Sequence, residues 1–200
     1  MVRILLVEDD ASAVETVREI LSEFPGHHVP VVATNRDEAI SLLTREFFDL
    51  MILDLRIPAE NGSPSALPEH GLAVFGRAKD AAPGMPIFLF TGSSVEDFVP
   101  SLLAGQQQVD IWGSEKLGTV QVVKKIDLDK LGHLLSPYIT GCRSLADVEL
   151  EREGDLLFST EDERLMRIFA RRFEGSRCVV TALSGGLSSS RVLKVKVLSP

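Results

Sequence analysis

The sequence is poor in the residues that build cross-linked or membrane-spanning proteins. Its two cysteines, Cys142 and Cys178, lie far apart in segments of different character, so we expect neither a disulfide nor a thiolate metal site. Its four histidines show no metal-ligand spacing. The apolar run Val2–Val7 is too short for a signal peptide, and no run approaches the roughly 20 apolar residues of a membrane span. We therefore expect a cytoplasmic protein that does not contact a membrane.

Basic residues are also scarce over most of the chain. Lysine and arginine number 21 against 29 acidic residues, which gives a net charge of −8. From Arg164 onward, however, eight basic residues stand against Glu174 alone, a balance of +7, so residues 1–163 carry about −15. This distribution argues against nucleic-acid contact as the function. The basic end indicates either an anion contact or an exposed surface that a partner covers.

What the sequence does contain is a regular alternation of apolar runs with helix-period segments, from Val2 to about Ile139. This alternation is typical of parallel βαβ units, and the apolar runs resemble strands that are covered on both faces. We expect an α/β fold with a doubly wound, five-stranded parallel sheet. Its predicted strands are Val2–Val7, His28–Ala33, Leu50–Asp54, Pro86–Thr91 and Thr119–Lys124.

Helices are predicted between and after these strands. They are Ala11–Phe24, a segment capped by Asn35, Gly71–Ala81, Val95–Ala104 and Asp127–Tyr138. Two connections, Ala59–Glu69 and Gly105–Gly118, are longer than a minimal version of this plan requires. Long connections of this kind are usually functional or mobile.

The pattern changes after Ile139. We interpret residues 1–139 as one domain, residues 140–150 as a linker and residues 151–200 as a short α+β extension. The extension has a predicted helix over Glu161–Phe173 and strands over Arg177–Leu183 and Arg191–Leu198. Because roughly 60 residues rarely bury enough apolar surface to be stable alone, we expect this extension to be the N-terminal part of an effector domain.

Acidic residues follow two of the predicted strands. Glu8 and Asp9 come after the first strand, and Asp54 ends the third. Because the carboxyl ends of parallel strands share one edge of the sheet, where ligands bind in such folds, we expect these carboxylates to lie together. Mg²⁺ prefers oxygen ligands and keeps several waters. Asp9 and Asp54 would bind it directly and Glu8 through a water, with the backbone carbonyl of Arg56 as a further ligand.

Asp54 is then a candidate nucleophile toward a phosphoryl group that the cation holds in line. Thr91, at the end of the fourth strand, would offer a hydroxyl to a phosphoryl oxygen, and Lys124, at the end of the fifth, would offer a positive charge. Any one acid has an alternative role, since Asp9 or Asp10 could cap the first helix. The complete set of strand-end groups favours the phosphoryl site.

Three motifs resemble the receiver domain of two-component response regulators: Val2–Asp10, Met51–Pro58 and Lys124–Leu131. The resemblance covers residues 1 to about 139 and implies a flavodoxin-like (βα)₅ fold with strand order 2-1-3-4-5. It also implies Mg²⁺-dependent phosphorylation by a histidine kinase, a phosphotransfer protein or a small phosphodonor, followed by slow hydrolysis. On this resemblance Glu8 and Asp9 match the acidic pair, Asp54 the phosphoacceptor, Thr91 the switch hydroxyl and Lys124 the site lysine.

The site lysine has two candidates. Lys124 matches a lysine followed by an Ile-Asp-Leu-Asp segment and a helix, and Lys116 is the alternative. The family usually carries proline after this lysine and an aromatic residue three positions before it, where the chain has Lys125 and Gln121. Trp112 is a candidate substitute for that aromatic residue. We therefore expect the route from the site to an output to differ from the usual one.

The C-terminal segment carries a weaker resemblance. Ser184–Ser190, followed by Arg191–Val197, is similar to the first hairpin of aminoglycoside-phosphotransferase-like kinases, where a Gly/Ser-rich turn lies over nucleotide phosphates. An ordinary hairpin turn explains the same residues equally well. None of that family's catalytic-loop residues occurs before Pro200, so we expect no kinase activity from these residues alone.

Two functions therefore stand. The first is a receiver that is phosphorylated at Asp54 and controls a C-terminal effector domain. The alternative is a phosphorylation-independent receiver-fold module for dimerisation or partner docking, and in either case we expect a homodimer face altered by the insertion over 105–118. A hydrolase on this fold would normally have a second acid two residues after the nucleophile, where this chain has Arg56.

Overall fold

The chain divides into two compact units. The computed structural model describes residues 2–26, 28–92, 102–103, 108–113, 115–183 and 192–199. The N-terminal unit comprises Met1–Val109 and Lys116–Thr140, and the C-terminal unit comprises Asp110–Glu115 and Gly141–Pro200. The chain therefore passes between the two units three times.

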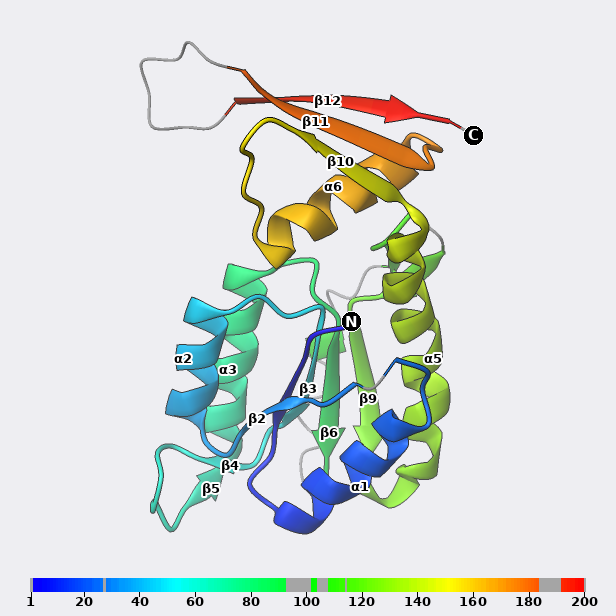
Figure 1. Cartoon of the computed structure of the whole chain (residues 1–200). Helices are drawn as coiled ribbons and strands as arrows, with labels where there is room; N and C mark the ends of the chain where they lie inside the picture. Colours follow the sequence, from blue (N-terminus) through cyan, green and yellow to red (C-terminus); the bar gives the residue numbers. More distant parts are fainter. Residues whose placement is uncertain are drawn as a thin grey trace. The chain divides into compact units, whose positions relative to one another are not determined.

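The N-terminal unit is built on a five-stranded parallel sheet (Figure 1). Its strands are β1 (Ile4–Val7), β2 (Val31–Ala33), β3 (Leu50–Asp54), β6 (Ile87–Thr91) and β9 (Val120–Lys124). They stand in the order β2-β1-β3-β6-β9, which is the order 2-1-3-4-5 of the five predicted strands. The predicted α/β, doubly wound, flavodoxin-like fold is therefore confirmed.

Helices cover both faces of this sheet. Among the described residues, α2 and α3 lie on one face and α1 and α5 on the other (Figure 1). Their bounds are α1 (Ala11–Ser22), α2 (Arg36–Arg45), α3 (Pro68–Ala81) and α5 (Asp129–Ser144). Asp10 caps α1 by accepting from the Ser12 N–H at 2.8 Å. Asn35 caps α2, as predicted, by accepting from the Glu38 N–H at 2.9 Å.

The sheet is held by apolar burial on both of its faces. Every residue of β1 and β3 is buried. Successive side chains of a strand point to opposite faces, and Leu5 and Leu53 belong to one apolar cluster with Ala39 of α2 and Val74 of α3. Each fully buried aliphatic side chain stabilises the fold by about 1.5–3 kcal/mol. The strand ends, where the acids lie, are thus set on a rigid base.

Strand β2 and the segment after β3 differ from the prediction. Strand β2 begins at Val31 instead of His28, because Pro30 has no N–H to join the ladder. The predicted loop Ala59–Glu69 contains one strand of a small antiparallel hairpin, which pairs β4 (Ile57–Pro58) with β5 (Ala66–Leu67).

The insertion over 105–118 also carries strands. Strands β7 (Gln108–Asp110) and β8 (Lys116–Gly118) form a two-stranded sheet. The predicted helix Val95–Ala104 lies outside the described residues, apart from residues 102 and 103, which are helical.

Residues 140–150 are not the linker that the sequence indicated. Helix α5 continues to Ser144 and is followed by the 3₁₀ turn η3 (Leu145–Asp147) and by strand β10 (Glu149–Glu153). Cys142 and Leu145 are fully buried. The Thr-Gly-Cys-Arg-Ser composition suggested a linker, but a glycine near a helix end costs only about 1 kcal/mol, which packing readily offsets.

The C-terminal unit is a three-stranded sheet with one helix. Its sheet order is β10-β11-β12, with β11 (Arg177–Leu183) antiparallel to β12 (Val192–Leu198) and parallel to β10. Helix α6 (Thr160–Arg172) contributes Ala170 to an apolar cluster with Val148, Cys178 and Val180. The predicted helix and two strands are thus present, and β10 is an addition. No helix in the described part of either unit is long and apolar enough for a membrane span.

Arginines of α6 contact backbone carbonyl groups of the C-terminal unit. Arg164 donates to Cys142 O at 3.4 Å, and Arg167 donates to Val148 O at 3.2 Å. Arg171 donates to both the hydroxyl and the carbonyl of Ser144. Several basic residues at this end of the chain therefore serve packing, because their guanidinium groups donate to carbonyls in the last turn of α5 and just beyond it.

Candidate functional site

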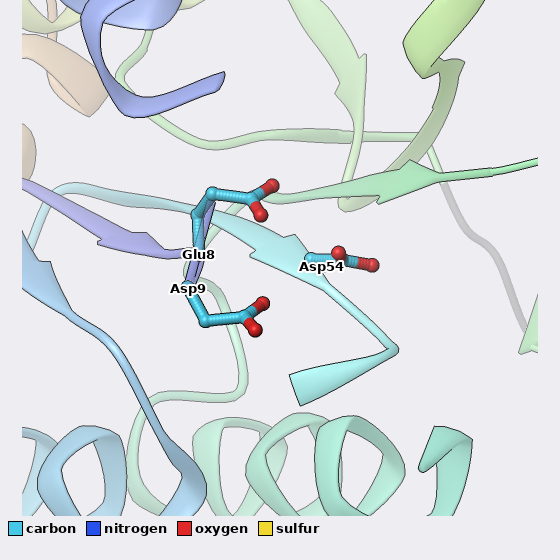
Figure 2. Close-up of side chains that lie close together, drawn as sticks. All are labelled: Glu8, Asp9 and Asp54. Atoms are coloured by element: carbon cyan, nitrogen blue, oxygen red, sulfur yellow. The ribbon is translucent and has the colours of Figure 1, made fainter. Parts of the chain in front are cut away.

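Three carboxylates meet at the carboxyl edge of the N-terminal sheet. Glu8 and Asp9 follow β1 and Asp54 ends β3, and their carboxylate groups turn to the same side (Figure 2). Carboxylate oxygens of the three residues lie within 4.8 Å of one another. Glu8 is 0% exposed and Asp54 4% exposed, whereas Asp9 faces solvent. The predicted clustering of these acids is therefore observed.

Backbone groups hold two of these carboxylates in place. The Arg56 N–H donates to Asp54 Oδ1 at 3.0 Å, and the Asp10 N–H donates to Glu8 Oε1 at 3.1 Å. These bonds leave the remaining oxygen of each carboxylate, Oδ2 of Asp54 and Oε2 of Glu8, available to a common cation.

The cation that reaches both oxygens is Lys125, not Lys124 as the motif predicted. The Lys125 Nζ lies 2.7 Å from Asp54 Oδ2 and 2.6 Å from Glu8 Oε2. It also lies 5.1 Å from the centroid of the Phe90 ring, within the range of a cation–π contact. Lys125 starts the 3₁₀ turn η2 (Lys125–Asp127) directly after β9.

The other lysine candidates lie elsewhere on the sheet. Lys124 is the last residue of β9, pairs with Thr91 in the ladder and is exposed. Because successive side chains alternate in direction along a strand, the one-residue difference decides which ammonium reaches the acids. Lys116 starts β8, ahead of the first residue of β9, and so belongs to the amino ends of the strands. Thr91 ends β6 as predicted, but its side chain lies outside what the structure describes.

With Lys125 as the site lysine, other residues occupy the two positions where the family usually has proline and an aromatic residue. Ile126 follows Lys125 and is 88% exposed, and Val122 stands three positions before it. No described peptide bond is cis. Gln121, which had been aligned with the aromatic residue, donates to Tyr138 Oη at 2.9 Å, and Tyr138 donates to Gly118 O at 2.7 Å.

Trp112 is buried, at 3% exposure, and belongs to the C-terminal unit. The prediction that Trp112 substitutes for the aromatic residue of the receiver family therefore gains no support from the structure.

Burial sets the electrostatics of the three charged groups around Asp54. It raises the pKa of the Glu8 carboxyl above its ordinary value, although the hydrogen bond from Lys125 opposes the rise. Burial likewise raises the pKa of Asp9. For Lys125, burial lowers the pKa, but the hydrogen bonds to Asp54 and Glu8 outweigh it and the net pKa is raised. Burial and mutual repulsion thus make the ionised forms of these acids less favourable, and a nearby cation reduces that free-energy cost.

Helix α3 fixes the backbone just after Asp54. The Gly71 N–H donates to Leu55 O at 3.2 Å. A Cβ at Gly71 would lie 2.4 Å from both Leu55 Cα and Leu55 O, closer than any real contact. Only glycine therefore allows α3 to approach this segment so closely. The sequence carries no pattern that separates Gly71 from the other glycines of the chain.

Comparison with known families agrees with this geometry. The model of the response regulator receiver domain matches residues 4–109. The chain therefore belongs to the response regulator receiver family, and its acidic cluster is consistent with the phosphoacceptor site of that family. The match ends before β9 and does not extend to the C-terminal unit.

Curated relatives are similar over about half of the chain or less. The alginate biosynthesis transcriptional regulatory protein AlgB of Pseudomonas aeruginosa is 35% identical over 104 residues, which is 52% of this chain and 21% of AlgB. The transcriptional regulatory protein MalR of Bacillus subtilis is 32% identical over 62 residues, which is 31% of this chain and 26% of MalR. The chain thus spans about a fifth of AlgB and a quarter of MalR.

Solved structures support the fold. A response regulator receiver protein from Sinorhizobium medicae WSM419 is 18% identical with a TM-score of 0.50, and the match covers 70% of this chain and 94% of that one. The signal receiver domain of an HD domain-containing protein from Pseudomonas fluorescens Pf-5 is 19% identical, also with a TM-score of 0.50 over 70% of this chain and 94% of that one.

The residues present fit a divalent cation. An acidic triad such as Glu8, Asp9 and Asp54 is typical of the receiver Mg²⁺ site. Mg²⁺ takes oxygen ligands in a compact shell, and the triad supplies carboxylate oxygens within 4.8 Å of one another. Together with the ammonium of Lys125, the three carboxylates leave a formal charge of −2, which one divalent ion balances.

Proposed function

We propose that the chain accepts a phosphoryl group on Asp54 in a Mg²⁺-dependent reaction and passes the phosphorylated state to an effector domain. The donor would be a histidine kinase, a phosphotransfer protein or a small phosphodonor, and the reaction would take place in the cytoplasm. The observation that carries the proposal is the buried Asp54 carboxylate. It shares the Lys125 ammonium with Glu8, and carboxylate oxygens of Glu8, Asp9 and Asp54 lie within 4.8 Å of one another.

Each residue has a role in this proposal. Asp9, Asp54 and the Arg56 carbonyl would bind the cation directly, and Glu8 would bind it through a water. The cation would neutralise charge on the transferred group. The Arg56 N–H orients Asp54 by holding Oδ1.

Lys125 and Thr91 would contact the phosphoryl group. The Lys125 ammonium, now 2.7 Å from Oδ2, is within reach of a phosphoryl oxygen attached to Asp54. Thr91 would donate its hydroxyl to another phosphoryl oxygen. Attack by water would later remove the group from Asp54.

Incubation with acetyl phosphate and Mg²⁺ tests the proposal. Intact-protein mass spectrometry should show the addition of one phosphoryl group to the wild type, and EDTA should prevent it. Asp54→Asn should not be modified, whereas Asp80→Asn, which changes an exposed acid on α3, should behave as the wild type. Modification that persists in Asp54→Asn would rule out Asp54 as the acceptor.

The alternative is a receiver-fold module that docks or dimerises without phosphorylation. The departures at Ile126 and Val122 favour it, since the usual coupling residues are replaced. Size-exclusion chromatography with and without BeF₃⁻ separates the two functions. Dimerisation that responds to BeF₃⁻ supports phosphorylation control, and a BeF₃⁻-independent dimer supports the alternative.

For the effector, we propose the start of an aminoglycoside-phosphotransferase-like kinase domain. The antiparallel pairing of β11 with β12 supports it, because these strands flank the Gly/Ser-rich stretch, which lies outside the described residues. An ordinary hairpin would have the same pairing. Binding of a fluorescent ATP analogue to the full-length protein tests the proposal, and binding that survives Gly185→Val with Gly186→Val would contradict it. Transcriptional regulation, which the names of AlgB and MalR state, is a property of those proteins.

A further inference from the structure

His70 anchors the segment that follows Asp54. Its Nδ1 lies 2.9 Å from Ile57 O. A carbonyl oxygen only accepts, so Nδ1 carries the hydrogen of this bond. One residue further along α3, the Gly71 N–H donates to Leu55 O at 3.2 Å. Two consecutive residues of α3 therefore hold carbonyl groups on either side of Arg56.

Both backbone groups of Arg56 have a role at the site. Its N–H donates to Asp54 Oδ1 at 3.0 Å. Its carbonyl is the backbone ligand of the cation in the function proposed above. Both roles require a defined orientation of the peptide groups of Arg56. The bond from Gly71 holds the carbonyl of the preceding residue, Leu55, and the bond from His70 holds the carbonyl of the following residue, Ile57.

The segment is anchored once more beyond Ile57. The Asp37 N–H, in the first turn of α2, donates to Ala59 O at 3.1 Å. Strand β4 also pairs with β5, Ile57 opposite Leu67. Backbone bonds thus secure Leu55 and Ala59. Between them, Ile57 pairs with Leu67 in the small sheet, and its carbonyl also accepts the bond from the His70 side chain. Because this bond comes from a side chain, a single substitution at His70 removes it and leaves the backbone hydrogen bonds of the segment in place.

We propose that His70 is a positioning residue for the divalent cation. By fixing the Ile57 carbonyl, it holds the Arg56 peptide in the orientation in which its carbonyl binds the ion. The inference rests on the proposed function for the identity of the ligand, but it concerns the affinity of the site for the cation and not the phosphoryl transfer. Loss of a group that orients a metal ligand without touching the metal commonly changes metal affinity by about 10–100-fold.

Mn²⁺ titration of the full chain, followed by the electron paramagnetic resonance signal of the free ion, measures this affinity without a phosphodonor. Asp9→Asn identifies the part of the binding that belongs to this site. His70→Gln, whose amide cannot occupy the Nδ1 position, should weaken binding about tenfold. His70→Asn places an amide N–H near that position and should stay close to the wild type. His133→Ala, an exposed histidine of α5, is the matched control and should change nothing.

Equal Mn²⁺ affinity of folded His70→Gln and wild type would overturn the inference, as would equal weakening by His70→Asn and His70→Gln. Thermal unfolding without metal shows whether each variant is folded, and hydrogen exchange at the Arg56 amide should speed up in His70→Gln only. If the chain binds Mn²⁺ in this His70-dependent way but takes no phosphoryl group from acetyl phosphate, the proposed function fails and the inference stands.

Discussion

Lys125 and Asp54 are 71 residues apart in the sequence, yet the Lys125 ammonium lies 2.7 Å from Asp54 Oδ2. Parallel pairing of β3 with β6 and of β6 with β9 brings their strand ends to one edge. The same ammonium contacts Glu8 from β1. The contact thus ties three of the five strands of the sheet together at the site.

The adjacent lysines give a sharp test of this assignment. Lys125→Ala should reduce the rate of phosphorylation by acetyl phosphate about a hundredfold, the usual effect of losing one group that stabilises developing charge. Lys124→Ala removes an equal charge one residue away and should leave the rate within about twofold, since a surface charge contributes little. Phosphorylation rates from Phos-tag gels measure both. Equal losses in the two variants would contradict the assignment of Lys125.

Glu8 should make the metal-free protein less stable as the pH rises. Its folded-state pKa is raised above the ordinary 4.5, so its stabilising contribution is complete below that value and is lost as the pH rises through the folded pKa. Lys125 has a raised pKa above 10.5, so its own contribution persists until the pH passes that higher value.

Glu8→Gln should therefore raise the unfolding temperature in EDTA at about pH 7 and have little effect at about pH 4. Calorimetry at the two pH values measures this difference. Mg²⁺ should reverse the advantage, because the cation favours the ionised carboxylate. Glu19→Gln, on the exposed face of α1, is the control. A rise of the same size at both pH values would show that charge on Glu8 is not the cause.

Gly71 should not tolerate a methyl group. Gly71→Ala places Cβ 2.4 Å from Leu55 Cα and O, and α3 must move away from the segment after Asp54. The expected loss in the free energy of unfolding is about 1–3 kcal/mol. Gly76→Ala, in the same helix, meets nothing within 4 Å and should stabilise the protein by about 0.5–1 kcal/mol. Urea denaturation of both variants compares them, and a stable Gly71→Ala would disprove the close approach.

Arg171 should support the C-terminal unit through the end of α5. Arg171→Ala removes the bonds to the Ser144 hydroxyl and carbonyl. The hydroxyl keeps its bond to Gly141 O, but the carbonyl loses its Arg171 partner, at a cost of about 1–3 kcal/mol. Arg143→Ala removes an exposed arginine of α5 and should cost less than about 0.5 kcal/mol. Because Trp112 is buried in the C-terminal unit, its fluorescence reports unfolding there. An unchanged midpoint in Arg171→Ala would refute the role.

The sequence was a good guide to the strands that form the core and a poorer one to their connections. The run Leu50–Asp54 was predicted with its correct bounds because a continuous apolar stretch between polar segments has one interpretation. The hairpin over β4 and β5 was missed, because two-residue strands leave no periodicity to detect. Strand β10 was missed because Glu149–Glu153 is mostly charged and pairs with β11 without the apolar pattern of a strand.

At the site, the acids were predictable and the lysine was not. Glu8, Asp9 and Asp54 stand at the ends of recognisable strands, and parallel topology then brings them together. Lys124 and Lys125 are chemically identical neighbours, so residue type could not separate them. The predicted strand ended at Lys124, as β9 does, but the family motif was matched to this last strand residue, whereas the ammonium that reaches the acids belongs to the first residue after the strand.

Helix α5 runs without interruption from Asp129 to Ser144, while the boundary between the two units falls at Thr140. Any recombination that exchanges receivers between proteins of this kind therefore cannot use the unit boundary as its junction. A crossover at Thr140 would cut α5 four residues before its end. Cys142 and Ser144, which Arg164 and Arg171 contact, would then continue a helix from another protein. The exchangeable module is the receiver together with the whole of α5.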